Sequence, residues 1–352
     1  MQIRSQRICQ ILGAAVFALA LSGCDLPSNS ESASTRTDPP SRRPKATEMG
    51  DLSSPDLRRE PLVSSAEIAA SMARFEKSLR SQGLLRQDLD PPDAPFDAAT
   101  IATNFIRIAL YEEYTPVGGR LVAREKEALL RRWARPVRLQ VIFGDSVPEP
   151  RREADLAIVD ELAQRLSIAS GHPVRRVTRS GNFVVFVVNE DERLTLDRQL
   201  NAAIPGLPSS VRNTILDLSP SILCVAVGFS NSSDNASYSR AVAIIRAEHP
   251  PLLRKACFHE EITQGLGLPN DSDQVRPSIF NDDEEFALLT RHDEYLLKIL
   301  FDPRLKPGMG LSEASPIVAE IAQELLPMDV LATDEAALVL DPDPEVVAPL
   351  SE

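Results

Sequence analysis

The hydrophobic spacing of this chain changes near residue 133, and that change constrains the fold more than any other feature. Before it, apolar residues in 64–113 recur every three or four positions, which predicts helices. After it, alternating or continuous apolar runs predict strands at 137–143, 174–178, 183–188, 222–229 and 238–246. Further helices are expected at 121–134, 153–169, 251–266, 286–301 and 312–325. This order of elements predicts an α+β fold with a central sheet.

The first 23 residues have the pattern of a secretory signal peptide. Arg4 and Arg7 precede the uncharged run 11–21, which is too short to cross a bilayer as a mature helix. The run leads into Leu-Ser-Gly followed by Cys24, which resembles the lipobox of bacterial lipoproteins. This resemblance implies cleavage before Cys24, acylation of its thiol with palmitate-type chains, and a lipid anchor facing the periplasm. The alternative is an ordinary signal peptide with an incidental cysteine, and the choice between inner and outer membrane stays open.

The rest of the chain divides by composition. Residues 24–60 are rich in Ser, Pro and charge, which predicts a disordered tether. We expect residues 61–132 to form an N-terminal helical region and residues 133–328 to form the main α+β domain. Residues 329–352 are acidic and contain proline, and are expected to be a flexible tail.

Charge and cysteine content narrow the partners and the compartment. The formal net charge of −13 argues against nucleic acid and against electrostatic adhesion to anionic lipid. Any membrane attachment would therefore come from the lipid. Cys9 would leave with the signal and Cys24 would be acylated, so Cys224 and Cys257 remain. Outside the cytoplasm such a pair predicts a disulfide, and the alternative is two buried free thiols.

The segment 259–271 carries the residues of greatest chemical interest. On a helix, Glu260 and Gln264 lie four residues apart and share one face. Gly267 would end that helix, so that Asn270 or Asp271 could fold back toward the same face. The sequence therefore predicts that polar side chains from a helix and from the following loop meet at one place.

This arrangement resembles the active-site segment of the metzincin zinc peptidases, especially the matrixins, whose pattern is H-E-x-x-H-x-x-G-x-x-H. Aligning Gly267 with the family glycine places Glu260, Gln264 and Asn270 at the three zinc-ligand positions. The same alignment places Glu261 at the position of the general base. The resemblance thus implies that Glu261 is the candidate catalytic residue.

Two downstream motifs extend the likeness. Ser278 to Phe280 reads Ser-Ile-Phe and resembles the Met-turn of that family, with Phe280 in place of methionine. Residues 289–301 resemble the final matrixin helix. The resemblance spans roughly 133–301 and implies a metzincin-like domain with a mixed sheet, an active-site-type helix, a glycine turn and C-terminal helices.

The chain departs from the family in the metal ligands. All three histidines are missing, and neutral imidazole is the ligand that suits zinc in such sites. Zinc is therefore not expected, whereas calcium or another divalent cation, which accepts oxygen ligands, stays open. A site centred on His259 is disfavoured because Thr263 stands four residues later. A further interpretation is that Gln264 and Asn270 hydrogen-bond across the turn that a metal would bridge.

A dense set of carboxylates surrounds these positions. It comprises Glu260, Glu261, Asp271, Asp282, Asp283, Glu284 and Glu285. One interpretation is a solvated helix end and loop. The other is a cleft in which two carboxylates serve as acid and base.

The chain resembles an uncharacterised proteobacterial family of secreted proteins and lipoproteins more closely than it resembles the metzincins; that family is known only as a domain of unknown function. Its hallmark is E-E-x-x-Q-x-L-G-L-x-N-D, followed by S-I-F-N-D-D, L-T-x-x-D and Y/F-D-P-R-L-x-P-G-M. Here these motifs stand at 260–271, 278–283, 289–293 and 301–309. This resemblance assigns a family and almost no biochemistry.

Three functions follow as hypotheses. The first is an envelope lipoprotein with a degenerate peptidase-like domain, a pseudoenzyme that binds an envelope protein or an extended peptide. The second is an atypical metallopeptidase or hydrolase with Glu261 as general base. The third is a module that binds peptidoglycan or another partner in a substrate groove that was retained after catalytic activity was lost.

Overall fold

The computed structural model describes residues 63–117, 119–230 and 236–327. The predicted signal 1–23, the predicted acylation site Cys24, and the segments expected to be a tether (24–60) and a tail (329–352) therefore lie outside the described residues. Within the described ranges, none of the helices combines the length and apolarity that crossing a bilayer requires.

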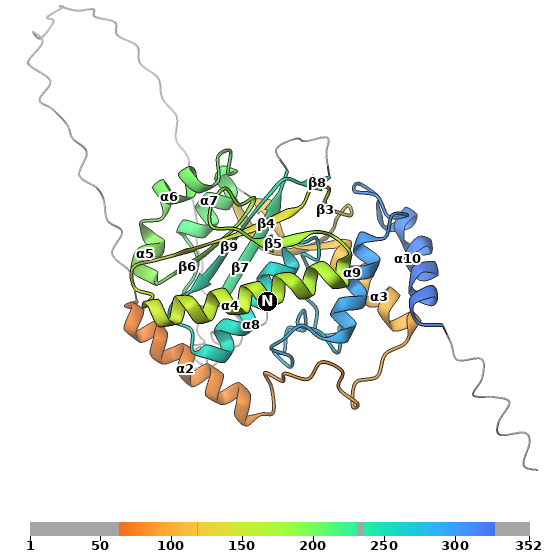
Figure 1. Cartoon of the computed structure of the whole chain (residues 1–352), viewed down its shortest axis with the longest axis horizontal. Coiled ribbons are helices and arrows are strands. Elements are labelled where there is room, and N and C mark those ends of the chain that lie inside the picture. Colours follow the sequence, from red (N-terminus) through yellow and green to blue (C-terminus); the bar gives the residue numbers. More distant parts are fainter. Residues whose placement is uncertain (1–62, 118, 231–235, 328–352) are drawn as a thin grey trace, which may run out of the picture.

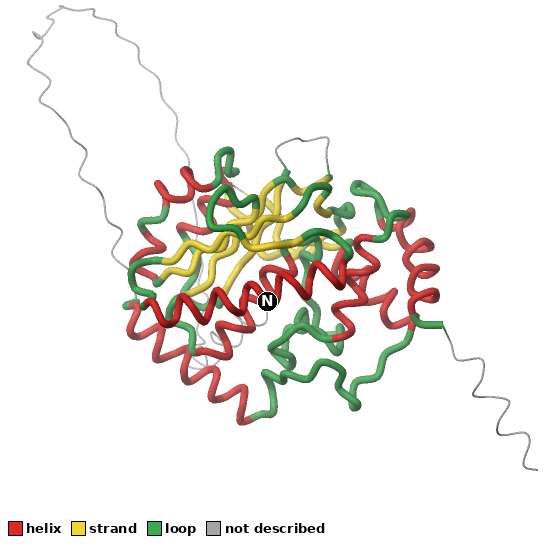
Figure 2. Tube along the Cα trace, in the orientation of Figure 1, coloured by secondary structure: helices red, strands yellow, loops and turns green. Residues whose placement is uncertain are grey.

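A five-stranded sheet with the spatial order β5-β4-β6-β9-β7 forms the centre of the molecule (Figure 2). Its strands are β4 (Val137–Phe143), β5 (Val174–Arg176), β6 (Phe183–Val188), β7 (Cys224–Phe229) and β9 (Arg240–Arg246). β4, β5, β6 and β9 run parallel, and β7 runs antiparallel to β9 at one edge. Every residue of the central strand β6 is buried, as expected for an apolar strand covered on both faces. The structure is a mixed α/β fold, which is consistent with the predicted α+β class and its central sheet.

Helices cover both faces of this sheet (Figure 1). One face packs on α4 (Glu149–Ser170) and α8 (Pro251–Gln264), and α9 (Arg291–Phe301) packs against α4 within the same hydrophobic cluster. The other face packs on α6 (Asp197–Ala203) and α7 (Ser209–Leu216), which follow the short helix α5 (Glu190–Leu194). Alternate residues of β6 supply the two hydrophobic clusters, with Phe183 facing α8 and Phe186 facing the short helices. The remaining helices, α2 (Ser65–Ser81), α3 (Ala98–Ala109) and α10 (Leu311–Leu325), extend the first cluster.

The helix expected over 121–134 was a wrong prediction. This segment instead contributes β2 (Arg120–Glu127), which pairs antiparallel with β1 (Tyr111–Val117), and then β3 (Arg132–Trp133), which pairs with β8 (Ser237–Tyr238). The region 61–132 is therefore not helical throughout. Gly119 has a φ of 79°, a backbone conformation that glycine adopts without strain at a hairpin turn. The Gly-Gly pair between two β-compatible runs was the sequence signal for this hairpin.

Candidate functional site

Helix α8 carries the candidate residues through the interior of the domain. It begins after Pro250 with Pro251 at its first position, where a missing N–H is tolerated, and it ends at Gln264. Its last eight residues, 257–264, are all buried. His259, Glu260 and Gln264 are at most 7% exposed and Glu261 is fully buried. The interpretation of this helix end as a solvated acidic surface is therefore wrong.

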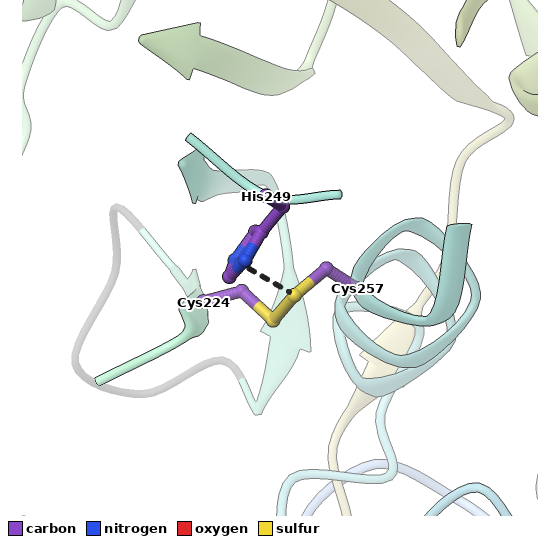
Figure 3. Close-up of side chains that lie close together, drawn as sticks. All are labelled: Cys224, His249 and Cys257. Carbon is purple, nitrogen blue, oxygen red and sulfur yellow. Dashed lines mark hydrogen bonds between the residues drawn. A yellow bond between two sulfur atoms is a disulfide. The ribbon is translucent and has the colours of Figure 1, made fainter. Parts of the chain in front are cut away.

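The predicted disulfide between Cys224 and Cys257 is present and joins the start of β7 to α8 (Figure 3). His249 lies beside it, with Nε2 at 2.8 Å from the Leu223 carbonyl oxygen and 3.5 Å from Cys257 Sγ. A carboxylate oxygen of Glu260, one of Glu261 and the sulfur of Cys224 all lie within 4.8 Å of one another. The two carboxylates that the sequence singled out thus converge on the disulfide.

The chain after α8 returns toward the helix as the sequence predicted. Gly267 has a φ of 133°, and a Cβ atom at this position would overlap the Arg131 carbonyl oxygen, so only glycine fits. Gln264 Nε2 donates to Asp271 Oδ1 at 2.7 Å. Asn270 Nδ2 donates to the carbonyl oxygen of Arg107 at 2.9 Å. The two amides therefore bond to different partners, and the expected bond between Gln264 and Asn270 was a wrong prediction.

These side chains do not fit a zinc centre of the peptidase type. The aligned positions offer one carboxylate and two amides, and amide oxygens are weak zinc ligands compared with the imidazole nitrogens of that family. Among the described residues, the potential metal-ligand groups are Cys224 with His249 and Cys257, and Cys224 with Glu260 and Glu261. Both groups include a disulfide sulfur, which offers no thiolate to a metal.

His259 is a buried neutral imidazole. Its Nδ1 accepts a hydrogen bond from the backbone N–H of Leu289 at 3.1 Å. The hydroxyl of Thr263 donates to the His259 carbonyl oxygen at 2.6 Å, so this hydroxyl serves the helix backbone. Burial lowers the pKa of His259 to about 3, and the positive charges of Lys255 and Arg165 add to this shift.

This low pKa predicts a pH dependence of stability. The imidazole protonates in the unfolded chain below its ordinary value of 6.5 but stays neutral in the folded chain down to about pH 3. Stability should therefore fall between these values as the pH decreases, by at most about 1.4 kcal/mol per pH unit from this group. His259→Gln, which can still accept from Leu289, is expected to reduce the slope. Urea unfolding of the wild type and of His259→Gln at pH 7 and pH 5 measures how the free energy of unfolding changes with pH. An equal change in the two proteins would contradict the prediction.

The Ser-Ile-Phe turn is tied to the start of α9 through one buried carboxylate. Asp293 Oδ1 accepts from Ser278 Oγ at 2.6 Å, and Asp293 Oδ2 accepts from the backbone N–H of Ile279 at 3.2 Å and of Thr290 at 2.8 Å. The Thr290 hydroxyl in turn accepts from the Asp293 N–H, which completes a capping box. Phe280 is fully buried below this turn. The motifs at 278–283 and 289–293 therefore form a single structural unit.

Removing this carboxylate should destabilise the domain. Asp293→Ala is expected to lower the free energy of unfolding by about 2–3 kcal/mol, because it removes a helix cap and leaves several buried donors without an acceptor. Urea denaturation at pH 7 measures the loss. Asp273→Ala, on an exposed residue of the neighbouring loop, should change stability by less than about 0.5 kcal/mol. Similar losses in both variants would contradict the assigned role of Asp293.

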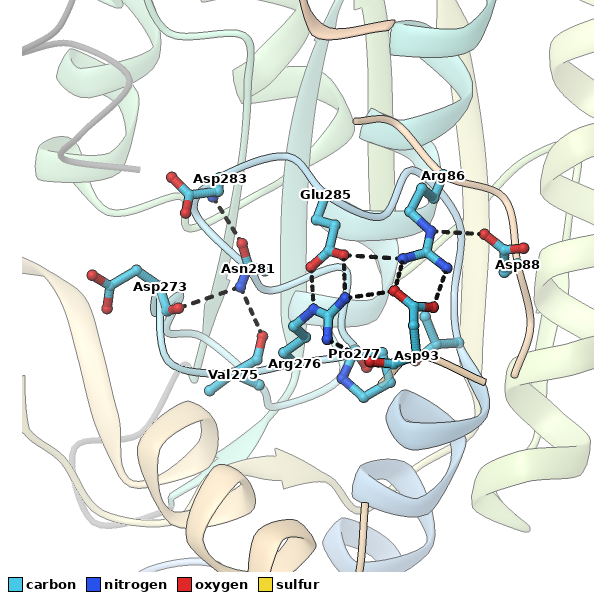
Figure 4. Close-up of polar contacts among 11 residues, drawn as sticks. Arg86, Asp88, Asp93, Asp273, Val275, Arg276, Pro277, Asn281, Asp283 and Glu285 are labelled. Atoms are coloured by element: carbon cyan, nitrogen blue, oxygen red, sulfur yellow. Dashed lines mark hydrogen bonds and ion pairs between the residues drawn. The ribbon is translucent and has the colours of Figure 1, made fainter. Parts of the chain in front are cut away.

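The acidic run after the turn is divided between separate environments (Figure 4). Glu285 pairs with Arg276 at 2.6 Å and with Arg86 at 3.2 Å, and both arginines also pair with Asp93. The hydrogen bond from Arg86 is the main cause that holds the pKa of Asp93 well below its usual range. This network joins the loop after α2 to the motif loop. The run is therefore not one acidic cleft.

Sequence reasoning missed some residues that organise this region. The T-x-x-D spacing of Thr290 and Asp293 is a capping signature and was visible in the sequence. No local signal marked Arg86 or His249, since both reach residues that are distant along the chain. His292 is likewise fully buried and bonds through Nε2 to Asn104 Nδ2 at 2.9 Å, a residue 188 positions earlier in the chain.

The fold and site define a mixed α/β domain in which a buried helix bears paired carboxylates next to a disulfide. The model of a family described as a protein of unknown function (DUF2927) matches residues 98–320, more than half of the chain. The chain belongs to this family. The match begins at α3 and so extends across the boundary that the sequence placed at 132. No curated protein matches the chain.

Proposed function

We propose that this chain is a cell-envelope lipoprotein whose peptidase-like domain binds a partner without zinc catalysis. The proposal rests on the hydrogen bonding and burial of the residues that align with the peptidase ligands and general base. Gln264 and Asn270 hydrogen-bond to the protein's own groups, and Glu261 is fully buried near the disulfide. A general base has to come within hydrogen-bonding reach of a substrate proton, and burial of Glu261 opposes this.

A distant kinship with metzincins is part of the proposal. It is supported by a mixed sheet, a helix followed by a glycine bend, a buried Ser-Ile-Phe turn and C-terminal helices. Metal ligands could be lost while this framework stayed, because hydrogen bonds of Asn270 and Asp293 hold the loop and the turn in place.

The proposed partner is an extended segment of an envelope protein that adds to the edge strand β7. β7 pairs with β9 on one side and ends the sheet on the other. Extended peptides bind such edges through backbone hydrogen bonds. β7 contains six residues, whereas β5 at the opposite edge contains three, so β7 offers the longer ladder.

Site-specific cross-linking tests this partner. A photo-reactive residue at Val227, partly exposed on β7, is expected to capture an envelope protein in cells. The same residue at Val122, exposed on the hairpin strand β2, serves as the matched control. Capture of the same proteins from both positions would contradict an edge-strand partner.

Metal content and activity distinguish the proposal from the alternative hydrolase. One observation favours the hydrolase: the Glu260 and Glu261 carboxylates lie within 4.8 Å, a pairing that acid–base chemistry can use. We expect purified protein to hold no stoichiometric zinc by elemental analysis and to show no peptidase activity that Glu261→Gln abolishes. Stoichiometric metal together with Glu261-dependent cleavage would establish the hydrolase instead.

The lipid anchor has its own test. Cells fed radioactive palmitate should label the wild-type chain and leave Cys24→Ala unlabelled, because the thiol carries the acyl chain. Fractionation of the inner and outer membranes then identifies which of them holds the protein. Equal labelling of both forms would exclude acylation at Cys24.

A further inference from the structure

A cavity of about 400 Å³ lies at the amino-terminal ends of the parallel strands, away from the carboxylates of α8. Its wall includes Arg138 near the start of β4, Asn182 just before β6 and Arg240 at the start of β9. Arg135 contributes a third guanidinium from the segment that leads into β4. We call this feature the arginine cleft. Its volume falls in the range of small-molecule sites.

The arginine cleft concentrates positive charge in an acidic protein. Among the described residues, three guanidinium groups and no carboxylate line it, although the chain carries a formal charge of −13. Throughout the residues that the structure describes, no ion pair joins Arg135, Arg138 or Arg240 to an acidic side chain. This contrasts with Arg86, Arg246 and Arg254, each of which pairs with a carboxylate. Uncompensated guanidiniums in a concave site attract anions strongly, because the surrounding protein focuses their field.

The arginine donors are only partly used within the protein. Arg138 Nε donates to the Ser180 carbonyl oxygen at 3.1 Å, and Arg240 Nη1 makes a long contact of 3.5 Å with the Gly181 carbonyl oxygen. Each guanidinium has five N–H groups in a planar fork, so several donors per arginine remain for a ligand. This fork matches the paired oxygens of phosphate or carboxylate.

The wall of the cleft is built before any ligand arrives. The Trp133 indole N–H donates to the Gly265 carbonyl oxygen at 2.7 Å, and its ring stacks on Phe183 and meets Tyr238 edge-on. Asn182 accepts from the Arg138 backbone N–H at 2.6 Å and donates to the Pro136 carbonyl oxygen at 3.0 Å. Groups held in this way lose little freedom on binding, which favours affinity.

We propose that the arginine cleft binds a small ligand through a multiply charged oxyanion group, either a phosphate or clustered carboxylates. Arg138 and Arg240 donate hydrogen bonds to the oxygens of the ligand, and the exposed Arg135 adds positive charge at the rim of the cleft. This site is separate from α8 and does not depend on the proposed loss of catalysis. The proposal assigns a class of ligand to the domain, whereas the family description names no ligand.

Binding of inorganic phosphate and of citrate to the purified chain tests the proposal. Calorimetric titrations at constant ionic strength, set with sodium chloride, should show saturable binding of at least one of the two. Arg138→Gln/Arg240→Gln should weaken that binding at least tenfold, and Arg135→Gln should weaken it several-fold. Arg175→Gln, an exposed arginine on β5 outside the cleft, should leave it unchanged.

The two anions separate the possible ligand sources, since preference for phosphate indicates a phosphate ester and preference for citrate indicates a polycarboxylate. Thermal unfolding without ligand verifies that each variant is folded. If the double variant fails to fold, the anion affinity of Arg135→Gln, compared with that of Arg175→Gln, still tests the proposal. Absence of saturable binding by either anion, or equal affinity in the cleft variants and the wild type, would overturn the proposal.

Discussion

Replacing Glu190 with glutamine is expected to lower the free energy of unfolding by about 3–5 kcal/mol, the loss typical of breaking a buried ion pair. The Glu190 carboxylate accepts from Arg193 Nη2 at 2.6 Å and from Arg246 Nη1 at 2.7 Å. The three side chains are at most 5% exposed. Glutamine keeps the shape but not the charge, so the two buried guanidiniums lose the carboxylate that pairs with both of them.

The same cluster predicts how the effect changes with pH. Burial raises the pKa of Glu190, but the hydrogen bonds from Arg193 and Arg246 together outweigh it, so the pKa lies below its usual value of 4.5. The ionised carboxylate therefore stabilises the fold above pH 4.5, and this contribution is lost as the pH falls through the folded-state pKa. The difference between wild type and Glu190→Gln should shrink on acidification below pH 4.5.

Urea unfolding at pH 7 measures the first effect, and a series toward pH 3 measures the second. Glu149→Gln is the matched control, because Glu149 is 72% exposed and its contact with Arg152 is 4.0 Å. The control should lose less than about 0.5 kcal/mol. A loss below 1 kcal/mol in Glu190→Gln would show that the cluster does not need this charge.

Removing the disulfide should cost about 3–4 kcal/mol. Cys224 and Cys257 are 33 residues apart, and closing a loop of this length restricts the unfolded chain by roughly that free energy. The bond also joins the edge strand β7 to α8, so its loss should loosen the proposed binding edge. The double variant Cys224→Ala/Cys257→Ala is the direct test, with urea unfolding under non-reducing conditions as the measurement.

The wild type supplies the control for this experiment. Once reductant and denaturant together have opened the buried bond, its unfolding midpoint should approach that of the double variant. The double variant itself should not respond to reductant. Identical midpoints for oxidised and reduced wild type would mean that the bond contributes nothing to stability.

Several features follow from short stretches of sequence. The apolar run of β6 had to be buried on both faces, and the Ser64 capping box begins α2 as its spacing predicts. The disulfide was predictable because only Cys224 and Cys257 remain once Cys9 and Cys24 are assigned to the signal and the anchor. Gly267 was recognisable as the bend after α8, because a positive φ favours glycine.

Only the tertiary structure decided how these pieces combine. It placed β7 antiparallel at the sheet edge, brought the Glu260 and Glu261 carboxylates near the disulfide, and gave Gln264 a partner other than Asn270. It also gathered Arg135, Arg138 and Arg240 from two parts of the chain into one cleft. The physical reason is the distance along the chain between the residues that interact. Periodicity, caps and glycine bends depend on neighbours within a few residues, whereas partners tens to nearly two hundred residues apart meet only when packed layers bring them together.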